Sequence, residues 1–284
     1  SEASRSGGDD ADVNVLHSEG VKPSTHRRMT RIDLSGGLVL ITGGAGSIGS
    51  AIAVQAAQAG ANVAVCDTKI DTAERIAAEI RANGGGANAF YLDVTDAIAV
   101  REIMQRAVEE LGELRGLVTA AGLLRTGPLE TQAHQEWQQM MAVNVDGTFH
   151  AVQAAIPYLK SPGGSIVTLG SVSAFIGSAD GGGYTTSKGA VLSLSYAAAG
   201  ELATKGIRVN NVAPGWVDGG FTHQAFKASD DPDALKRKAC ALHPLGRMAT
   251  PCDVANAVVW LLSDQAAFIT GSMLLVDGGF MIQH

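Results

Sequence analysis

The feature of this chain that most restricts its fold is an alternation of two kinds of segment, which begins at about Gly36. Short runs of almost wholly apolar residues are each followed by a longer segment with helical periodicity. The apolar runs predict strands over residues 38–42, 62–67, 87–94, 114–122, 165–171, 207–215 and 272–279, and the longer segments predict helices over 51–60, 72–85, 98–112, 134–160, 184–204 and 252–262. Apolar strands that alternate with helices are typical of a parallel sheet covered on both faces. We therefore predict an α/β fold, a Rossmann-type doubly wound parallel sheet of about seven strands.

The domain organisation follows from the absence of a linker or a change in composition after residue 36. Residues 33–284 are predicted to form one dinucleotide-binding domain. Residues 1–32 are predicted to be a flexible N-terminal extension, because the first 30 are polar and acidic and lack the apolar core of a targeting signal. Within the domain, residues 216–248 are the most irregular part and are predicted to form a lid over the substrate.

Charge and cysteine content argue against several classes of partner. The net charge is −7 at pH 7 and charged residues of both signs are mixed along the chain, which disfavours nucleic-acid binding. Cys66, Cys240 and Cys252 show no CxxC spacing, so we expect no metal site and a reduced, cytoplasmic protein. No apolar run approaches membrane-spanning length, so we expect no membrane partner.

A glycine-rich loop, TGGAGSIG, follows the first predicted strand and begins the first predicted helix. Backbone N–H groups in such a loop can approach a pyrophosphate, and the helix N-terminus adds partial positive charge. Asp67 ends the second strand about 20 residues later, where a carboxylate can accept hydrogen bonds from a ribose diol and would repel a 2′-phosphate. The predicted cofactor is therefore NAD, although Lys69 lies nearby and Asp67 could instead be a simple turn residue. The candidate phosphate-binding residues are Gly43, Gly46, Ser47, Ile48 and Gly49.

Tyr184 and Lys188 in the segment GGGYTTSKGA are spaced to lie on the same face of a helix. An ammonium beside the phenol would lower a pKa that is normally about 10, which suits a proton shuttle. By itself, this spacing more often belongs to an exposed surface pair, so the other motifs of the chain are needed to favour a catalytic role.

Several further motifs occur in the order and at the spacing of a known family. They are TGGAGSIG, Asp67, LDV at 92–94, AAG at 120–122, Asn144 in VNVDG, Ser171, YTTSK at 184–188, NNVAPG at 210–215 and ITGSMLLVDGG at 269–279. Together they resemble the compact, single-domain branch of the short-chain dehydrogenase/reductase family, and the likeness runs from Asp33 to Gly279. The resemblance implies an NAD(H)-dependent enzyme that interconverts a secondary alcohol and a ketone, and a homotetramer or homodimer.

The resemblance also implies roles for individual residues. Tyr184 would exchange a proton with the substrate oxygen, Lys188 would hold the nicotinamide ribose, Ser171 would orient the substrate, and Asn144 would hold a water of the proton relay. Further cofactor contacts would come from Asp93 and Val94 at the adenine, Ala121 and Gly122 along the adenosine side, and Pro214, Gly215 and Val217 at the nicotinamide.

Three features of the chain depart from the family pattern. Ser47 replaces a glycine of the phosphate loop, which gives a spacing more typical of the longer sugar-nucleotide branch. Thr119 and Ala120 replace two asparagines before the Ala-Gly pair. Gly219 lies where a threonine often contacts the cofactor.

The substrate is predicted to be a hydrophobic alcohol or ketone, because Phe175, Trp216 and Phe221 offer apolar surface near the expected site. The same side chains could equally be packing beneath a loop. The alternatives to an alcohol dehydrogenase are a 3-oxoacyl thioester (acyl-carrier) reductase, an epimerase, and a non-catalytic dinucleotide-sensing module.

Overall fold

The apolar strands lie in the interior of a covered sheet. Every residue of β1 (Leu38–Thr42), β5 (Ser165–Leu169) and β6 (Arg208–Pro214) is buried. The computed structural model describes residues 32–159, 164–177 and 180–283, so the predicted extension lies almost wholly outside the described residues. The remaining strands are β2 (Asn62–Asp67), β3 (Ala87–Tyr91), β4 (Leu114–Thr119) and β7 (Met273–Val276).

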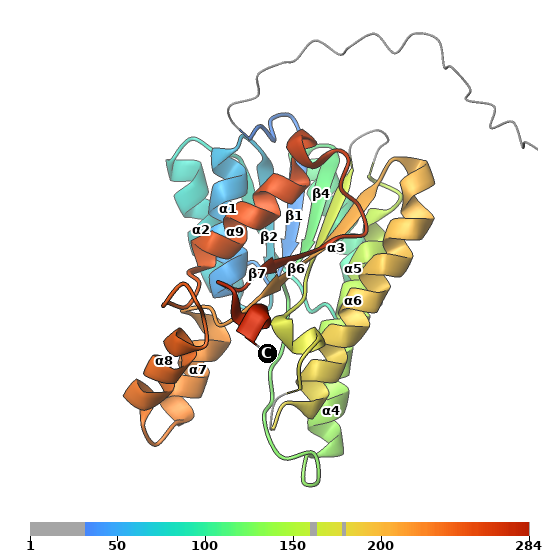
Figure 1. The fold of residues 1–284 in the computed structure, drawn as a ribbon. Helices are drawn as coiled ribbons and strands as arrows, with labels where there is room; N and C mark the ends of the chain where they lie inside the picture. The colour runs from blue at the N-terminus through green and yellow to red at the C-terminus, as the bar shows by residue number, and fades with distance from the viewer. Residues whose placement is uncertain (1–31, 160–163, 178–179, 284) are drawn as a thin grey trace, which may run out of the picture. The chain divides into compact units, whose positions relative to one another are not determined.

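The seven strands form one sheet in the order β3-β2-β1-β4-β5-β6-β7, and all neighbouring strands are parallel (Figure 1). The chain starts in the centre at β1, runs outward to β3, and returns to β4 before it runs outward again to β7. The strand order therefore reverses between β1 and β4. In open α/β sheets, ligands bind at the carboxyl ends of the strands beside such a reversal.

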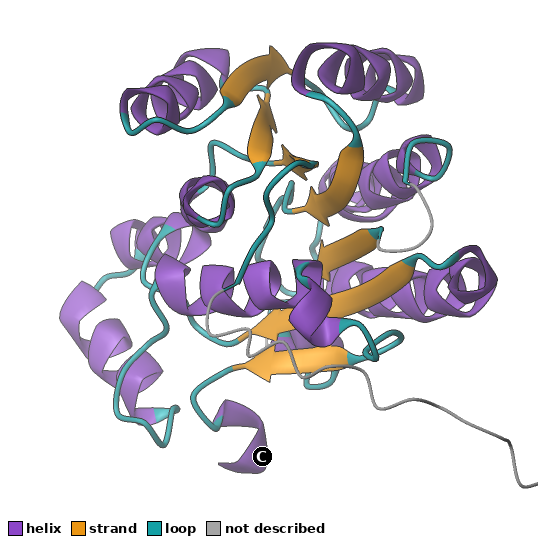
Figure 2. Ribbon diagram, turned by 90° about the horizontal axis from the view of Figure 1, so that it is seen from above, coloured by secondary structure: helices purple, strands orange, loops and turns teal. Residues whose placement is uncertain are grey.

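Helices cover both faces of this sheet (Figure 2). They are α1 (Ser47–Gln58), α2 (Ile70–Ala82), α3 (Ala97–Leu111), α4 (His134–Met141), α5 (Gly147–Ala155), α6 (Gly182–Leu202), α7 (Gly220–Ala228), α8 (Pro232–Ala241) and α9 (Pro251–Leu262). Buried residues of α1, α2 and α9 form one apolar cluster with the sheet, and those of α3, α5 and α6 form a second cluster on the opposite face. The predicted doubly wound α/β fold in a single domain is confirmed.

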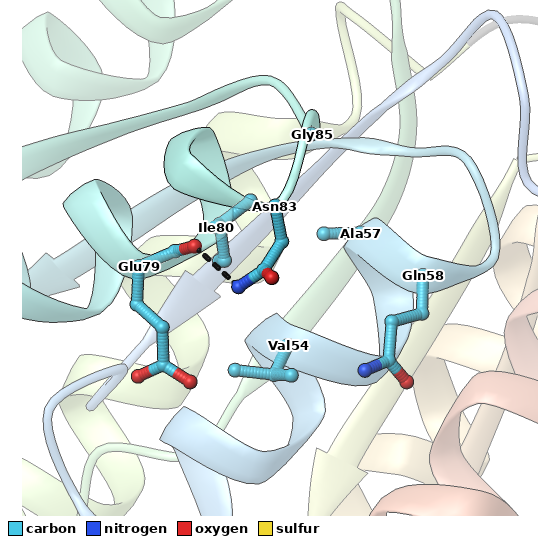
Figure 3. Close-up of a pocket in the computed structure, with 7 residues that line it drawn as sticks. All are labelled: Val54, Ala57, Gln58, Glu79, Ile80, Asn83 and Gly85. Carbon is cyan, nitrogen blue, oxygen red and sulfur yellow. Dashed lines mark hydrogen bonds between the residues drawn. The ribbon is translucent and has the colours of Figure 1, made fainter.

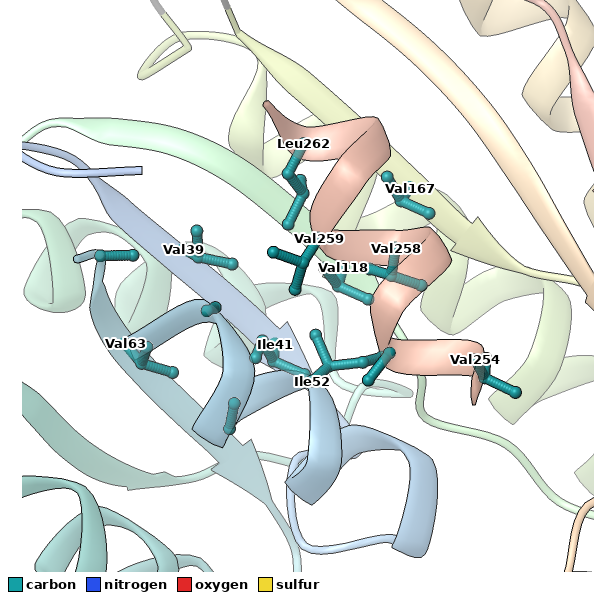
Figure 4. Packing of buried hydrophobic residues seen from close by; sticks show 14 of the residues in the cluster. Val39, Ile41, Ile52, Val63, Val118, Val167, Val254, Val258, Val259 and Leu262 are labelled. Atoms are coloured by element: carbon teal, nitrogen blue, oxygen red, sulfur yellow. The ribbon is translucent and has the colours of Figure 1, made fainter. Parts of the chain in front are cut away.

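The first cluster shows how α1 and α9 are held against the central strands (Figure 4). Ile52 of α1 and Val258 of α9 are fully buried over Ile41 and Val118. Complete burial of such a side chain contributes about 1.5–3 kcal/mol. This packing fixes the start of α1 at the carboxyl edge of the sheet.

Several predicted segments differ from the structure. The predicted helix over 134–160 is divided into α4, a π-helical turn at Ala142–Asp146 and α5, and Lys160 lies outside the described residues. The predicted irregular segment 216–248 contains both α7 and α8. Strands predicted to reach Val94 and Gly122 end three residues earlier, at Tyr91 and Thr119. Burial continues past the end of β3, which is why an apolar run overestimates its length.

In the part of the chain that the structure describes, no helix is long and apolar enough to cross a bilayer.

Candidate active site

The glycine-rich loop between β1 and α1 folds back on itself, with the Gly46 N–H donating to the Gly43 carbonyl at 3.0 Å. Gly43 has a φ of +67°, and a Cβ there would lie 2.4 Å from the backbone nitrogen of Ala121. A Cβ on Gly49 would lie 2.2 Å from the Gly43 carbonyl oxygen. Both positions therefore require glycine, since a side chain would displace backbone on the other side of the loop.

The N-terminus of α1 carries no side-chain cap. Asp96 and Thr250 cap α3 and α9 by accepting hydrogen bonds from N–H groups in the first turn, whereas the N-cap of α1 is Gly46. Ser47 and Ile48, the first two residues of α1, are half-buried at this end. The first N–H groups of the helix thus remain available to a ligand, and this arrangement fits a pyrophosphate.

Asp67 lies beside this loop, at the end of β2. One carboxylate oxygen accepts from the Ala45 N–H at 3.0 Å and the other from the Lys69 N–H at 2.9 Å. Each oxygen keeps a lone pair for a further donor. The carboxylate is half-buried and its charge lies next to the loop, which fits a ribose diol and opposes a second phosphate.

Ser171, Tyr184 and Lys188 meet at the carboxyl end of β5. Ser171 begins a short 3-10 turn directly after that strand, and its Oγ accepts from the Ser173 N–H at 3.1 Å. Tyr184 and Lys188 lie in the first two turns of α6, and a hydrogen bond joins the hydroxyl groups of Tyr184 and Ser171. The structure thus brings together the three residues that the sequence placed in one catalytic group.

Lys188 is buried, and its Nζ donates to the carbonyl of Leu169 at 2.8 Å. Nζ lies 5.7 Å from the centroid of the Tyr184 ring, over the ring rather than at the hydroxyl. Burial lowers the pKa of Lys188 to about 8. No sequence signal identifies the carbonyl group that holds this ammonium, because every residue carries one.

The expected lowering of the Tyr184 pKa is wrong. Burial of the phenol raises its pKa to about 12, and the hydrogen bond from Ser171 opposes this only in part. The cause is that burial destabilises the charged phenolate by more than the hydrogen bond from Ser171 stabilises it. At neutral pH the side chain is therefore a protonated donor.

Asn144 lies in the π-helical turn and joins two other segments of the site. Its amide nitrogen donates to the Leu123 carbonyl and to Ser187 Oγ, both at 2.9 Å, and its amide oxygen accepts from the Leu123 N–H at 2.7 Å. Both amide hydrogens are thus used within the protein. Ser187 Oγ in turn donates to the Tyr184 carbonyl at 2.7 Å, so this serine, which the sequence analysis did not single out, joins Asn144 to α6.

The other predicted cofactor residues surround the same edge of the sheet, with different degrees of access. The Asp93 carboxylate accepts from the backbone and hydroxyl of Thr95, and Val94 is buried against Gly147. A Cβ on Gly122 would lie 3.6 Å from Asn144 Oδ1 and 3.7 Å from the Phe221 ring.

The turn after β6 is held from within the protein. Pro214 ends the strand, and a Cβ on Gly215 would lie 2.7 Å from His243 Nε2. Val217 belongs to the apolar cluster under α1 and α9 and pairs with Ala249 in an isolated parallel bridge. Among these residues, Val217 is better placed for packing than for contact with a ligand.

Of the three apolar side chains predicted to contact the substrate together with Ser171 and Tyr184, one lies beside the catalytic group. The Phe221 ring lies 6.3 Å from the Tyr184 ring in an edge-to-face arrangement at 86°. Trp216 is half-buried at the start of the lid segment. Phe175 follows the Ser171 turn and is 42% exposed, and no contact among the described residues brings it to Tyr184.

A hollow between α1 and α2 lies at the opposite edge of the sheet (Figure 3). It has a volume of about 60 Å³, far below the roughly 300–1,000 Å³ of ligand pockets. It therefore does not compete with the glycine-rich loop as a cofactor site. Within the described ranges, no group of three or more His, Cys, Asp or Glu residues could hold a metal ion.

Comparison with known proteins places the chain among dehydrogenases and reductases. A family model described as enoyl-(acyl carrier protein) reductase matches residues 43–281. The chain is 40% identical over 243 residues to 2-(S)-hydroxypropyl-CoM dehydrogenase 3 of Xanthobacter autotrophicus, covering 85% of this chain and 95% of that protein. It is 39% identical over 250 residues to the 2,5-dichloro-2,5-cyclohexadiene-1,4-diol dehydrogenase LinX of Sphingobium indicum, covering 88% and 98%.

A solved structure of a dehydrogenase/reductase from Sinorhizobium meliloti 1021 superposes with a TM-score of 0.82. The two sequences are 34% identical, and the match covers 89% of this chain and 98% of that one.

Proposed function

This chain belongs to the short-chain dehydrogenase/reductase family, and we propose that it is an NAD(H)-dependent oxidoreductase that interconverts a secondary alcohol and the corresponding ketone. The observation that carries the proposal is the meeting of Ser171, Tyr184 and Lys188 at the carboxyl edge of the sheet, beside an uncapped glycine-rich loop.

The residues present fit the cofactor that the family implies. Gly43 and Gly49 allow the loop to pack tightly against its own backbone and that of Ala121, the first N–H groups of α1 would hold the phosphates, and Asp67 would accept hydrogen bonds from the adenosine ribose. When bound, the dinucleotide supplies or accepts the hydride at its nicotinamide ring. Asp67 favours NAD over NADP, because its carboxylate would lie against the 2′-phosphate.

Tyr184 is the proton donor in ketone reduction and the acceptor in alcohol oxidation. Its pKa of about 12 leaves it protonated at neutral pH, which is the form that ketone reduction requires, whereas alcohol oxidation requires the phenolate. Ser171 holds that oxygen through the hydroxyl already bonded to Tyr184, and Lys188 keeps a positive charge beneath the phenol ring. Phe221 shields the phenol from one side, and with Trp216 it favours an apolar substrate.

The test follows absorbance of the reduced nicotinamide with a panel of secondary alcohols and ketones, using NAD and NADP in parallel. Tyr184→Phe should abolish turnover and retain NADH binding by fluorescence titration. Tyr196→Phe is the matched control, because this tyrosine lies on the same helix but is exposed to solvent. Activity with NADP alone would overturn the role of Asp67, and undiminished activity in Tyr184→Phe would overturn the mechanism.

Reduction of a 3-oxoacyl thioester is the second candidate, favoured by a 33% identity over 250 residues to the 3-oxoacyl-[acyl-carrier-protein] reductase FabG of Thermotoga maritima. An acetoacetyl thioester in the same panel distinguishes the two. Tight NADH binding without turnover on any substrate would instead favour the dinucleotide-sensing module.

The proposal extends to the assembly and its location. Phe149 on α5 is 45% exposed, which supports burial of this helix between copies of the chain in a homotetramer or homodimer. Light scattering after gel filtration would give the mass of the assembly. A cytoplasmic location agrees with three unpaired thiols.

A further inference from the structure

His243 is a buried imidazole that none of the roles above uses. It lies near the end of the lid segment 216–248 and is only 2% exposed. Its Nδ1 lies 2.7 Å from the carbonyl oxygen of Ala239, and its Nε2 lies 3.2 Å from the backbone nitrogen of Trp216.

These two partners determine the protonation state of the ring. A carbonyl can only accept a hydrogen bond and a backbone N–H can only donate one, so Nδ1 must carry the proton and Nε2 must be bare. Only the neutral Nδ1–H tautomer satisfies both contacts. With both nitrogens engaged inside the protein, His243 is not available as a catalytic base.

The ring joins three segments that are far apart in sequence. Ala239 belongs to α8, and Trp216 directly follows the Pro214–Gly215 turn at the end of β6. The ring of Phe280, near the C-terminus, lies 5.4 Å from the imidazole.

A second contact holds the same residue from the same side. The Trp216 carbonyl accepts from the Ala249 N–H at 2.9 Å, and the Asp218 N–H donates to the Ala249 carbonyl at 2.8 Å. Both backbone groups of Trp216 are therefore held by the far end of the lid segment. The chain between them forms α7 and α8, and α7 carries the Phe221 ring that contacts Tyr184.

We propose that His243 is a positioning residue. The two hydrogen bonds of its neutral imidazole, to the Ala239 carbonyl and from the Trp216 N–H, join the two ends of the lid segment, and we call this pair of bonds the clasp. The clasp sets where Trp216 and Phe221 lie relative to Tyr184. The effect on turnover rests on the proposed function, whereas the clasp itself does not. Gly215 belongs to the same arrangement, because a side chain there would meet Nε2.

Two variants separate the two hydrogen bonds of the ring. The amide of Asn reaches the position of Nδ1 but not that of Nε2, so His243→Asn loses the acceptor for Trp216. The amide of the longer Gln reaches the position of Nε2, so His243→Gln can keep it. In His243→Asn, the Trp216 N–H loses its hydrogen-bond acceptor, so its closed state is less stable. Hydrogen exchange of this amide should therefore be about tenfold faster or more. His243→Gln should stay within about threefold of the wild type by the same reasoning.

Kinetics then test the positioning role. In His243→Asn, the KM for the alcohol should rise by about tenfold, since one hydrogen bond that orients the lid is lost. The kcat should change less and the NADH dissociation constant should stay within about twofold, whereas His243→Gln should restore KM. The positioning role would be overturned if His243→Asn and His243→Gln had equal KM values although hydrogen exchange of the Trp216 amide differed between them.

A measurement on the unaltered protein covers the case in which His243→Asn does not fold. Nitrogen chemical shifts of labelled histidine distinguish the two neutral tautomers, and the clasp requires Nδ1–H for His243 with slow exchange of the Trp216 amide. The Nε2–H tautomer, or rapid exchange, would overturn it. Failure of the proposed function would show up separately, as an absence of turnover in the wild type.

Discussion

Gly219 and Ser47 show where the lid segment meets the phosphate loop, and a substitution there has a calculable cost. Gly219 has a φ of 162° and a ψ of 178°, an extended conformation that any residue adopts. A Cβ at this position would nevertheless lie 2.9 Å from both Cβ and Oγ of Ser47. Carbon atoms in contact are normally about 3.5–4.0 Å apart, so a side chain at 219 and the serine at 47 exclude each other.

The perturbation is Gly219→Thr, which introduces the residue that the family pattern leads one to expect. Overpacking of this kind costs about 1–3 kcal/mol. In a domain of this size, such a cost lowers Tm by roughly 2–12 °C. Ser47→Gly removes the obstruction, so the double variant should recover most of the loss, and the coupling between the two positions should be about 1–3 kcal/mol.

The assay compares the four proteins of this cycle by urea unfolding and by NADH fluorescence titration. Gly127→Thr is the control, because a Cβ at Gly127 meets no atom within 4 Å and its φ is not positive. If Gly219→Thr were as stable as the wild type, or if the two changes were additive to within about 0.5 kcal/mol, the steric argument would be refuted.

Three further substitutions test other contacts of the site and its surroundings. Lys188→Met removes the buried ammonium, so turnover should be lost. Because burial of the charged group lowers the pKa of Lys188 to about 8, its removal should raise the unfolding free energy at pH 7 by up to roughly 3 kcal/mol. The wild type should regain that stability between about pH 8 and 10.5, where only its unfolded state remains protonated, and the variant should show no such rise in calorimetry. Ser187→Ala leaves an amide hydrogen of Asn144 unpaired and should cost about 1 kcal/mol in urea unfolding. Arg247→Gln removes the hydrogen bonds that lower the pKa of Asp253. In the wild type, this lowered pKa contributes stability at pH values above the unfolded pKa of about 3.9. That stability is lost as the pH falls through the lower pKa of the folded state. Acid unfolding between about pH 5 and 2 should therefore be less steep in this variant than in the wild type.

The sequence was sufficient to predict the sheet because burial on both faces requires continuous apolar strands, and such runs are visible without a structure. It was less informative about where elements end. Leu92 and Val94 stay buried after the chain leaves the sheet, so their apolar character suggested a longer β3. The helix over 134–160 contains a π-helical turn around Asn144, whose side-chain contacts are made with residues distant in sequence.

For the site, the sequence identified the side chains but not the forces on them. The spacing of Tyr184 and Lys188 correctly placed both on α6. It could not show that burial outweighs the ammonium in determining the tyrosine pKa, because burial depends on the whole fold. The contact of His243 with Trp216 spans 27 positions and has no local pattern.

Asp67 has a consequence for how such an enzyme could change its coenzyme during evolution or in the laboratory. The carboxylate that we propose selects against a 2′-phosphate also accepts the hydrogen bond from the Ala45 N–H, within the loop that we propose binds the pyrophosphate. Replacing it with a small neutral residue would admit the extra phosphate and, in the same step, release the loop that binds both coenzymes. If the proposed NAD specificity holds, we expect a successful exchange of NAD for NADP to need a second, compensating change near Ala45, and single substitutions at Asp67 to weaken binding of both coenzymes.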